Sequence, residues 1–329
     1  MSNTGVDGYD VIGDVHGCAD ALEQLLGQMG YHVRGGVWRH PSRQAVFVGD
    51  LIDRGSRQVD TVTIVRSMVE AGAARATMGN HEFNAIAWMT EDPEQPGTWL
   101  RSRKGEPGQR HRHQHVEFLH QVGEDSAQHL EIVDWFRTLP MWLDLGGLRV
   151  AHACWHDDSL AVLPVVSPDT PISVDFMVRA HDRPPEGEEG GSAEYHAVET
   201  VLKGPEMPVP EPYFDKDGHP RTHARIRWWD RKAATMRQLA EIPPKSRGKG
   251  GGPYPPLPDV PSTAADAYRY DGDVPVAFGH YWRTEATPVV EPRAVCVDYS
   301  AVRRGHLAAY RWDGESTVDA SKLVKVSTS

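Results

Sequence analysis

The chain has few cysteines, no long apolar run and no apolar segment at its start. Its three cysteines are spread widely over 329 residues, so a disulfide framework of the secreted type is not expected. No stretch approaches the roughly 18 consecutive apolar residues that span a bilayer, and no leader-like segment opens the sequence. We therefore expect a protein of the reducing cytoplasm with no membrane partner.

The sequence also lacks an excess of basic residues. It has 46 Asp and Glu against 35 Lys and Arg, which gives a net charge of −11 and a pI near 5.8. Nonspecific binding of nucleic acid depends on clustered Lys and Arg, so we do not expect it, although local basic sites are compatible with this balance. The glycine-rich fingerprints of dinucleotide-binding and P-loop proteins are absent as well.

What the first quarter does contain is three short polar motifs in order. They are Gly13–Gly17 (GDVHG), Gly49–Gly55 (GDLIDRG) and Gly79–Glu82 (GNHE). Each follows a short apolar run that reads as a buried strand, namely Tyr9–Ile12, Ala45–Val48 and Ala74–Met78. Apolar residues at helical spacing over 19–29 and 57–71 predict the intervening helices. This order predicts parallel strands whose carboxyl ends carry the motifs, where α/β sheets bind ligands.

The side chains in these motifs suit a divalent metal centre. Oxygen and imidazole donors favour Mn, Fe, Zn or Ni over a thiolate site, and the motifs supply Asp14, His16, Asp50 and Asn80. Asp50 can bridge two ions, since a carboxylate has two oxygens. A pair of ions lowers the pKa of a bridging water and polarises phosphoryl oxygens. The motifs therefore predict hydrolysis of a phosphate ester or anhydride by in-line attack of that water.

With these motifs complete, residues 9 to 90 resemble the calcineurin-like metallophosphoesterases. The similarity is to their phosphoprotein phosphatase branch, which includes bacterial diadenosine tetraphosphate hydrolases and the phosphatase domain of polynucleotide kinase-phosphatase. The resemblance implies an α/β fold, a four-layer α/β/β/α sandwich of two mixed sheets. It implies two further metal-binding histidines, for which the sequence offers His152 after one strand-like run and His280 after another.

The same resemblance implies a set of ligands for two divalent ions. One ion would be bound by Asp14, His16 and Asp50, and the other by Asp50, Asn80, His152 and His280. Manganese is the expected metal, with Fe, Zn, Ni or Co as alternatives.

The resemblance further implies roles for residues beside the ions. His81 would act as general acid on the leaving oxygen, and Asp53 would orient and charge that imidazole. Arg54 would bind nonbridging phosphate oxygens with its planar fork. Arg225 and Arg227 lie where nucleotide-hydrolysing relatives have a substrate-binding arginine.

The remaining sequence predicts how the chain is organised. The motifs extend from residue 14 to residue 280, so we expect a single domain over 1–329 with an insertion at about 161–270. Trp228 and Trp229 in this insertion would either stack on a base or pack against the core. The Pro/Gly-rich stretches 184–191 and 243–261 predict surface loops, the second a candidate lid.

Two other segments carry predictions of their own. Gln95–His115 is polar and predicts a loop, in which the histidines at 111–115 form either a solvated cluster or a third metal site. Val116–Leu139 predicts one or two helices. Ala294–Tyr299 and His306–Trp312 resemble the final hairpin of the family and would pack in the second sheet.

The predicted substrate is a dinucleoside polyphosphate such as diadenosine tetraphosphate, or a related nucleotide. This follows from the similarity of residues 13–28 to the nucleotide-hydrolysing branch and from the Arg- and Trp-rich stretch at 221–229. One alternative is a serine/threonine protein phosphatase. Another is a binding or regulatory protein without turnover, which would lack a ligand or the Asp53–His81 pair, and all of these residues are present. The sequence leaves the oligomeric state open.

Overall fold

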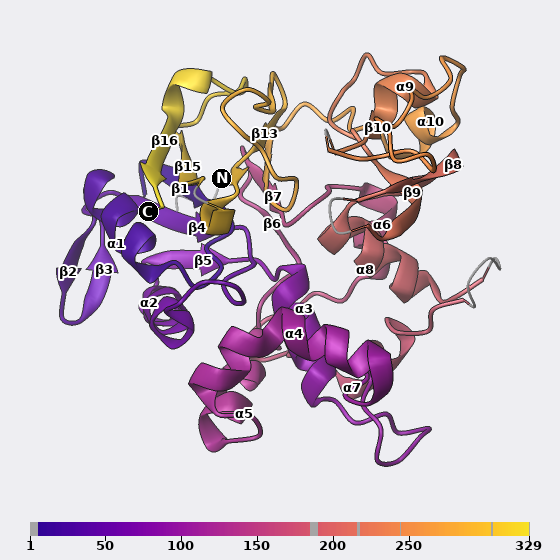
Figure 1. Cartoon of the computed structure of the whole chain (residues 1–329). Coiled ribbons are helices and arrows are strands. Elements are labelled where there is room, and N and C mark those ends of the chain that lie inside the picture. Colours follow the sequence, from indigo (N-terminus) through magenta and orange to yellow (C-terminus); the bar gives the residue numbers. More distant parts are fainter. Residues whose placement is uncertain (1–5, 185–189, 216–217, 244, 304, 329) are drawn as a thin grey trace.

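Two mixed β-sheets that face each other form the centre of the protein (Figure 1). The structure, a computed structural model, describes residues 6–184, 190–215, 218–243, 245–303 and 305–328. Within these ranges, the strands follow the short apolar runs of the sequence, and the polar motifs come directly after them.

The first sheet has the strand order β14-β15-β1-β4-β5, and β16 also pairs with β15. Its strands are β1 (Gly8–Ile12), β4 (Arg43–Phe47), β5 (Ala74–Ala76), β14 (Asp298–Tyr299), β15 (His306–Trp312) and β16 (Leu323–Ser327). β1, β4 and β5 are parallel, and β15 is antiparallel to β1. The predicted parallel pairing of the first three strands is confirmed.

The second sheet has the order β12-β13-β11-β7-β6. Its strands are β6 (Trp142–Asp144), β7 (Arg149–Ala151), β11 (Val276–Phe278), β12 (Val290–Glu291) and β13 (Ala294–Cys296). The central strand β11 is parallel to both of its neighbours, whereas β6 and β12 add antiparallel edges. The carboxyl ends of β7, β11 and β13 therefore lie at one edge of this sheet.

A buried apolar cluster fills the space between the two sheets. It contains Val11 and Val46 of the first sheet and Val150, Ala277 and Val295 of the second. Because side chains alternate along a strand, the neighbouring residues point outward and pack against helices in a second, larger cluster. This arrangement confirms the predicted α/β fold, with two mixed sheets between helical layers.

Helices cover the outer faces of both sheets. They are α1 (Ala19–Gln28), α2 (Gln58–Glu70), α3 (Asn80–Met89), α4 (Gly105–Val122), α5 (Ala127–Phe136), α6 (Asp157–Val162), α7 (Val174–Arg179) and α8 (Ala193–Lys203), with short 3₁₀ turns at η1 (Ala301–Arg303) and η2 (Ala320–Lys322). α1 contacts β15 and β16, while α8 receives the end of β7 through a 3.0 Å bond from Ala153 N to Val201 O. Among the described residues, no helix combines the length and apolarity needed to cross a membrane.

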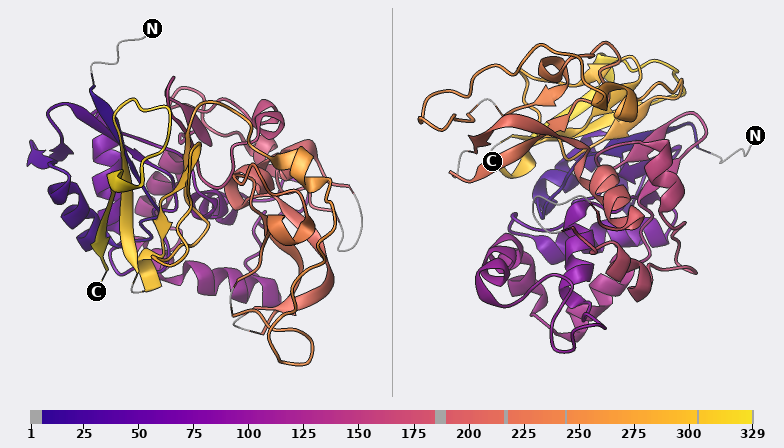
Figure 2. Two further views of the ribbon diagram at one scale, coloured as in Figure 1. Left: turned by 90° about the horizontal axis from the view of Figure 1, so that it is seen from above. Right: turned by 90° about the vertical axis from the view of Figure 1, so that its right-hand side faces the viewer.

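Residues 206–268 form a separate group of small elements. They are β8 (Glu206–Phe214), β9 (Pro220–Ile226), α9 (Met236–Leu239), β10 (Ala240–Glu241) and α10 (Ala264–Tyr268), with a small apolar cluster of their own. Figure 1 and the left panel of Figure 2 show this salmon and orange group on the side of the molecule opposite the hairpin of β2 (His32–Arg34) and β3 (Val37–Arg39). β9 extends toward the sheets and so can reach their ligand-binding edge.

Trp228 and Trp229 join this group to the core. Both are buried, and their ring centroids lie 4.8 and 5.1 Å from that of Phe278 on β11. Trp228 Nε1 also donates to Ala153 O at 2.9 Å. Of the two predicted roles, packing is therefore the one observed.

Two predicted segments are wrong. The predicted loop 95–115 ends early, because α4 begins at Gly105 and contains the histidine cluster. Pro107 lies in the first turn of α4, where its nitrogen needs no helical hydrogen bond, so it does not interrupt the helix. The final hairpin does not pack in the second sheet alone, since β13 belongs to that sheet whereas β14 and β15 belong to the first.

The predicted surface loops are described only in part. Residues 185–189 of the loop predicted at 184–191 lie outside the described residues, as does residue 244 of the segment 243–261. The described part of 243–261 pairs with the end of β8 through Phe214 and Arg247. Its role as a lid stays a prediction.

Candidate metal centre

Five strand ends bring the predicted metal ligands to one place. Asp14 and His16 follow β1, Asp50 follows β4, Asn80 opens α3 after β5, His152 follows β7 and His280 follows β11. All of these except Asn80 are at most 8% exposed. Titratable side chains gathered this deeply indicate a site, because isolated buried charges are costly.

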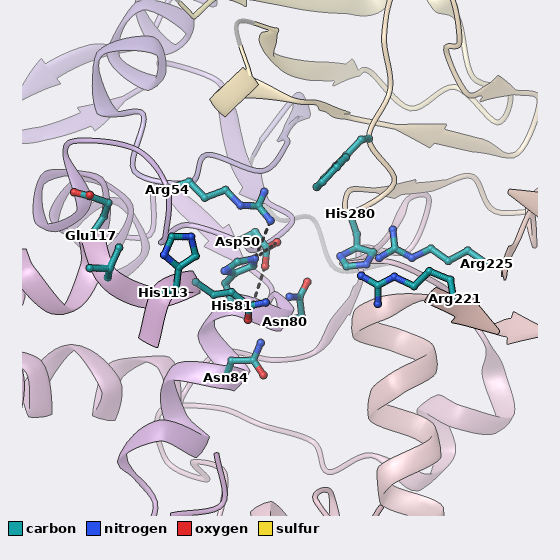
Figure 3. A pocket seen from close by; sticks show the side chains of 13 residues that line it. Asp50, Arg54, Asn80, His81, Asn84, His113, Glu117, Arg221, Arg225 and His280 are labelled. Carbon is teal, nitrogen blue, oxygen red and sulfur yellow. Dashed lines mark hydrogen bonds and ion pairs between the residues drawn. The ribbon is translucent and has the colours of Figure 1, made fainter. Parts of the chain in front are cut away.

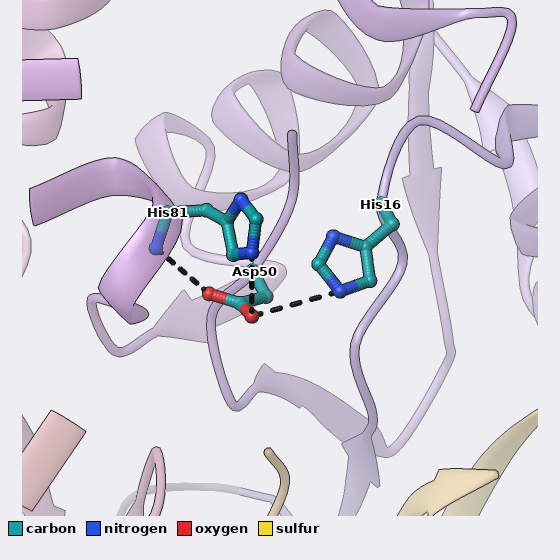
Figure 4. Close-up of side chains that lie close together, drawn as sticks. All are labelled: His16, Asp50 and His81. Atoms are coloured by element: carbon teal, nitrogen blue, oxygen red, sulfur yellow. Dashed lines mark hydrogen bonds and ion pairs between the residues drawn. The ribbon is translucent and has the colours of Figure 1, made fainter. Parts of the chain in front are cut away.

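Asp50 lies between two groups of histidines. Its Oδ2 atom is 3.6 Å from His16 Nε2 and 3.8 Å from His81 Nε2, as Figure 4 shows. Its Oδ1 atom is 3.4 Å from His152 Nε2. The potential ligand atoms of His16, Asp50 and His81 lie within 4.8 Å of one another, and so do those of Asp50, His152 and His280. The carboxylate thus presents one oxygen to each group.

Hydrogen bonds fix the imidazoles with Nε2 toward the centre. His16 Nδ1 lies 2.8 Å from Ile52 O, and His152 Nδ1 lies 2.9 Å from Val48 O. A carbonyl oxygen can only accept, so each Nδ1 carries the proton and each Nε2 of the neutral ring directs a lone pair to the centre, where that of His16 accepts from Arg54 Nη1 at 2.8 Å. This is the tautomer that a metal ligand needs.

Asn80 and Asp14 complete the surroundings. Asn80 Oδ1 is 3.1 Å from His152 Nε2, which puts the amide in the second group. Asp14 lies outside both compact groups, and its carboxylate accepts from His280 N at 3.2 and 3.3 Å. A Cβ on Gly279 would come 2.1 Å from Asp14 Oδ1, so only glycine permits this approach.

The charges at the site favour a bound cation. Burial and the nearby Asp298 and Asp50 raise the pKa of Asp14 well above its usual range. Burial alone would raise the pKa of Asp50, but the histidines around it hold that pKa well below its ordinary value. A cation would relieve the repulsion between these carboxylates, so the donor set fits divalent metal.

The lowered pKa values of two of these histidines agree with this fit. Burial and the Arg54 guanidinium lower the pKa of His16 to about 3, and burial with Arg225 lowers that of His280. Burial opposes protonation of His152, but Asp50 raises its pKa to about 9. Among the described residues, His280 Nε2 has no hydrogen-bond partner although it is buried. An unpartnered imidazole nitrogen at this position is available to a metal.

Glu82 supports Asp50 through the backbone. Its carboxylate accepts from Asp50 N and Leu51 N at 2.8 Å and from Gly79 N at 2.9 Å. Burial and the charge of Asp50 raise the pKa of Glu82 to about 7. Glu82 thereby ties the loop after β4 to the start of α3.

Asp53 lies between two histidines beside the centre. Its Oδ2 atom contacts His81 Nδ1 as predicted, and its Oδ1 atom is 2.5 Å from His115 Nδ1. Burial opposes protonation of His81, but the negative charges of Asp50 and Asp53 outweigh it and raise the pKa of His81. His115 was not predicted as a site residue. The signal for it was the apolar stripe of Phe118, Leu119 and Val122 at helical spacing after it.

A pocket of about 480 Å³ opens over the centre. It is lined by Asp50, Arg54, Asn80, His81, Asn84, His113, Gln114, Val116, Glu117, Arg221, Arg225, His280 and Trp282. Figure 3 shows Arg54 on one side of Asp50 and the pair Arg221 and Arg225 on the other, near His280. The Arg54 guanidinium carbon lies 5.6 Å from the ring centroid of Trp282.

Of the two predicted substrate-binding arginines, only Arg225 lines this pocket. β9 ends at Ile226, and the Arg227 side chain turns to Glu241, with Nε 2.6 Å from Oε2. Arg221 lies on the same face of β9 as Arg225, since strand residues four apart point the same way. Arg221, which lies in the predicted Arg- and Trp-rich stretch but was not named as a site residue, also lines the pocket, and Trp282 is a pocket residue that the sequence did not identify.

Several of these residues have left-handed backbone conformations. The φ angles are 49° for His16, 51° for Asp50, 71° for Asp53, 78° for Arg54 and 64° for His280. Such angles are costly for residues with a Cβ and cluster at functional sites. The turns that aim these side chains are therefore strained.

Known proteins with similar sequences cover part of this chain. A bis(5'-nucleosyl)-tetraphosphatase PrpE [asymmetrical] of Bacillus subtilis is 30% identical over 150 residues, which is 44% of this chain and 57% of the relative. The protein of the same name from Oceanobacillus iheyensis is 44% identical over 73 residues, 22% of this chain and 29% of its own. The chain thus spans about half or less of the length of these relatives.

A solved structure resembles the chain over nearly its whole length. It is a protein serine/threonine phosphatase from Saccharomyces cerevisiae, with a TM-score of 0.46, 13% identity, and coverage of 99% of this chain and 81% of that one. The family model described as calcineurin-like phosphoesterase matches residues 9–202, which include the first three motifs and His152. The chain belongs to the calcineurin-like phosphoesterase family.

Proposed function

We propose that this protein is a metal-dependent phosphoesterase that hydrolyses a dinucleoside polyphosphate such as diadenosine tetraphosphate, or a related nucleotide. One observation carries the proposal. The two oxygens of Asp50 face histidines on opposite sides, at the floor of a pocket that three arginines line. A bridging carboxylate under a cationic rim is suited to a phosphate group held at two ions.

The predicted ligand sets remain our proposal for the two ions. Asp14, His16 and Asp50 would hold one, and Asp50, Asn80, His152 and His280 the other. When bound, such ions act as Lewis acids toward phosphoryl oxygens and lower the pKa of water. His81 also lies within reach of Asp50, and we assign it as the general acid and not as a ligand.

The protein's own groups would orient the substrate and move one proton. Arg54 is exposed at the pocket and can donate two parallel hydrogen bonds to a phosphate. The contact of His81 Nδ1 with Asp53 leaves His81 Nε2 directed to the pocket, where it can give its proton to the leaving oxygen. The raised pKa of His81 favours the protonated form that an acid requires.

The choice of a nucleotide rests on the outer part of the pocket. Arg221 and Arg225 lie on the other side of Asp50 from Arg54 (Figure 3), where the parts of a nucleotide beyond its reacting phosphate could bind. Trp282, which is 42% exposed, offers an aromatic surface. The Bacillus relatives are named tetraphosphatases of bis(5'-nucleosyl) compounds, which supports the same substrate class.

The full chain loaded with Mn²⁺ tests the proposal. It would be compared on diadenosine tetraphosphate, ATP, an aryl phosphate and a phosphoserine peptide, with products separated by chromatography and metal content measured on the same sample. We expect two ions per chain and the highest kcat/KM on the dinucleotide. Faster turnover of the phosphopeptide would support the protein phosphatase instead, and tight binding without turnover would support a regulatory protein.

A further inference from the structure

Helix α4 holds the loop that carries Asp53 and Arg54. Gln121 of α4 accepts from Gln58 N at 2.7 Å and donates to Ser56 O at 2.9 Å. Gln58 in turn accepts from Asp53 N at 2.7 Å. The loop after β4 is therefore tied to α4 at several points.

His115 makes the most direct of these contacts. Its Nδ1 lies 2.5 Å from Asp53 Oδ1, while Asp53 Oδ2 contacts His81 Nδ1. His115 is 5% exposed and Asp53 is 2% exposed. The carboxylate is thus held at both oxygens, once from α3 and once from α4.

The surroundings of His115 leave it one hydrogen-bonding role. Its ring packs against Phe118 and Trp88, at centroid distances of 4.9 and 6.3 Å. Its Nε2 atom is buried and has no partner among the described residues. A proton on Nε2 would lack an acceptor there, so the favourable tautomer carries its proton on Nδ1 and donates it to Asp53.

We propose that His115 is a positioning residue for the general acid His81, because it fixes the Asp53 carboxylate that orients that acid. The inference rests on the proposed function, in which His81 protonates the leaving group. His115 lies across Asp53 from His81 and acts through that carboxylate. Removing a residue that supports an active-site group through a hydrogen bond typically lowers activity by roughly 10- to 100-fold.

Two substitutions separate the hydrogen bond from packing. His115→Phe keeps a ring in the slot between Phe118 and Trp88 but removes the donor. His115→Asn keeps a donor on Cγ, at the place of the imidazole Nδ1, and loses the rest of the ring. We expect His115→Phe to lower kcat roughly 10- to 100-fold on a substrate with a poor leaving group, and His115→Asn to recover most of that loss.

The leaving group provides the readout that packing would not change. With an aryl phosphate, whose leaving oxygen needs little protonation, His115→Phe should lower kcat much less, while metal content stays at the wild-type level. His129→Phe is the matched control, since His129 is also buried against Phe118, but its Nδ1 accepts from Asp125 N at 3.1 Å instead of contacting Asp53. It should keep wild-type kcat on both substrates.

The outcomes distinguish this inference from the proposed function. Equal losses on both substrates, or no recovery with His115→Asn, would overturn the positioning role. If His81→Asn itself shows no dependence on the leaving group, the acid assignment fails first. If His81→Asn shows that dependence and His115→Phe does not, only the role of His115 is overturned.

Discussion

Asp50 presents one carboxylate oxygen to each histidine group, and its replacement tests the bridge. In Asp50→Asn a neutral amide faces both groups and holds two dications poorly. We expect kcat to fall by more than roughly 100-fold, the upper end of the loss that is typical when a residue supporting a metal ligand is removed. We also expect fewer ions to be bound per chain. Metal analysis and kcat on the same preparation measure both effects.

The fold should survive this substitution, because Asn has nearly the shape of Asp and keeps an oxygen that can accept from His81 N. Asp60→Asn is a suitable control, since Asp60 is exposed and pairs with Arg57 on α2. Turnover near the wild-type level with two ions bound in Asp50→Asn would remove Asp50 from the centre.

His81 is the residue whose role is the most open to a kinetic test. His81→Asn keeps a donor toward Asp53 but has no atom in the place of Nε2. We expect kcat to fall roughly 10²- to 10⁴-fold on substrates with poor leaving groups and much less on an aryl phosphate, with metal content unchanged. A loss of one ion per chain would instead make His81 a ligand.

The residues that the sequence predicted well are those whose position depends on local structure. Asp14, His16 and Asp50 directly follow apolar strands and glycines, so their meeting at one sheet edge follows from the parallel order. Trp282 and His115 reach the site through contacts between distant segments. No local pattern specifies such contacts, although His115 shares its helical face with Phe118.

At the scale of elements, strand β9 decides which of its arginines line the pocket. Substituting Arg221 and Arg225 together with Ala should raise KM for diadenosine tetraphosphate roughly 10- to 100-fold, as expected for lost charge-assisted hydrogen bonds. KM for a small aryl phosphate should change little, because that substrate stays near Arg54. Steady-state kinetics on both substrates measure the difference.

Arg227→Ala is the matched control for this pair. It removes one positive charge, half of what the pair removes, at an arginine just beyond β9 that contacts Glu241 and does not line the pocket. If Arg227→Ala raised KM as much as the double substitution of Arg221 and Arg225, the positive charge of this region would bind the substrate without specific contacts. The sequence could not separate these arginines, since the end of β9 is set by its pairing with β10.

Helix α4 illustrates how polarity misleads prediction. Its exposed face is rich in His, Gln and Arg, so the segment reads as a loop, yet its inner face packs through Phe118 and Leu119. Tertiary contacts, among them those with α2 and α5, compensate for a sequence of this polarity.

At the scale of the whole molecule, bound metal should contribute to stability. Ions that bind only the folded state stabilise it by about 2.7 kcal/mol when their concentration is 100 times Kd. We expect chelation to lower Tm and added Mn²⁺ to restore it in a concentration-dependent way, as followed by calorimetry. The metal-dependent rise should be smaller in Asp50→Asn, and an equal rise would indicate binding elsewhere.

The organisation of the chain is only partly settled by its fold. Helices α7 and α8, within the predicted insertion 161–270, share the main core, whereas residues 207–265 have a small core of their own. The division into one domain with an insertion stays a prediction, and so does the cytoplasmic location. A sequence pattern identifies breaks in composition, but which core a helix joins depends on surfaces that meet only after folding.

The left-handed turns at the centre imply that stability and activity compete in this protein. Arg54 has a φ of 78°, and its side chain is exposed, so little packing is lost when it is removed. Left-handed backbone costs roughly 1–2 kcal/mol for a residue with a Cβ, and glycine avoids this cost. Part of the gain is offset because glycine loses more conformational entropy on folding. Arg54→Gly should therefore raise the free energy of unfolding by roughly 0.5–1 kcal/mol relative to Arg54→Ala.

Urea denaturation of the two variants measures that difference, and identical unfolding free energies would show that the turn is not strained. Both variants should lose phosphate binding to a similar extent, because both lack the guanidinium. A selection for thermal stability alone would then favour glycine at such positions and erode the catalytic centre. Thermostable variants of this enzyme are accordingly better sought in its outer helices than at its strand ends.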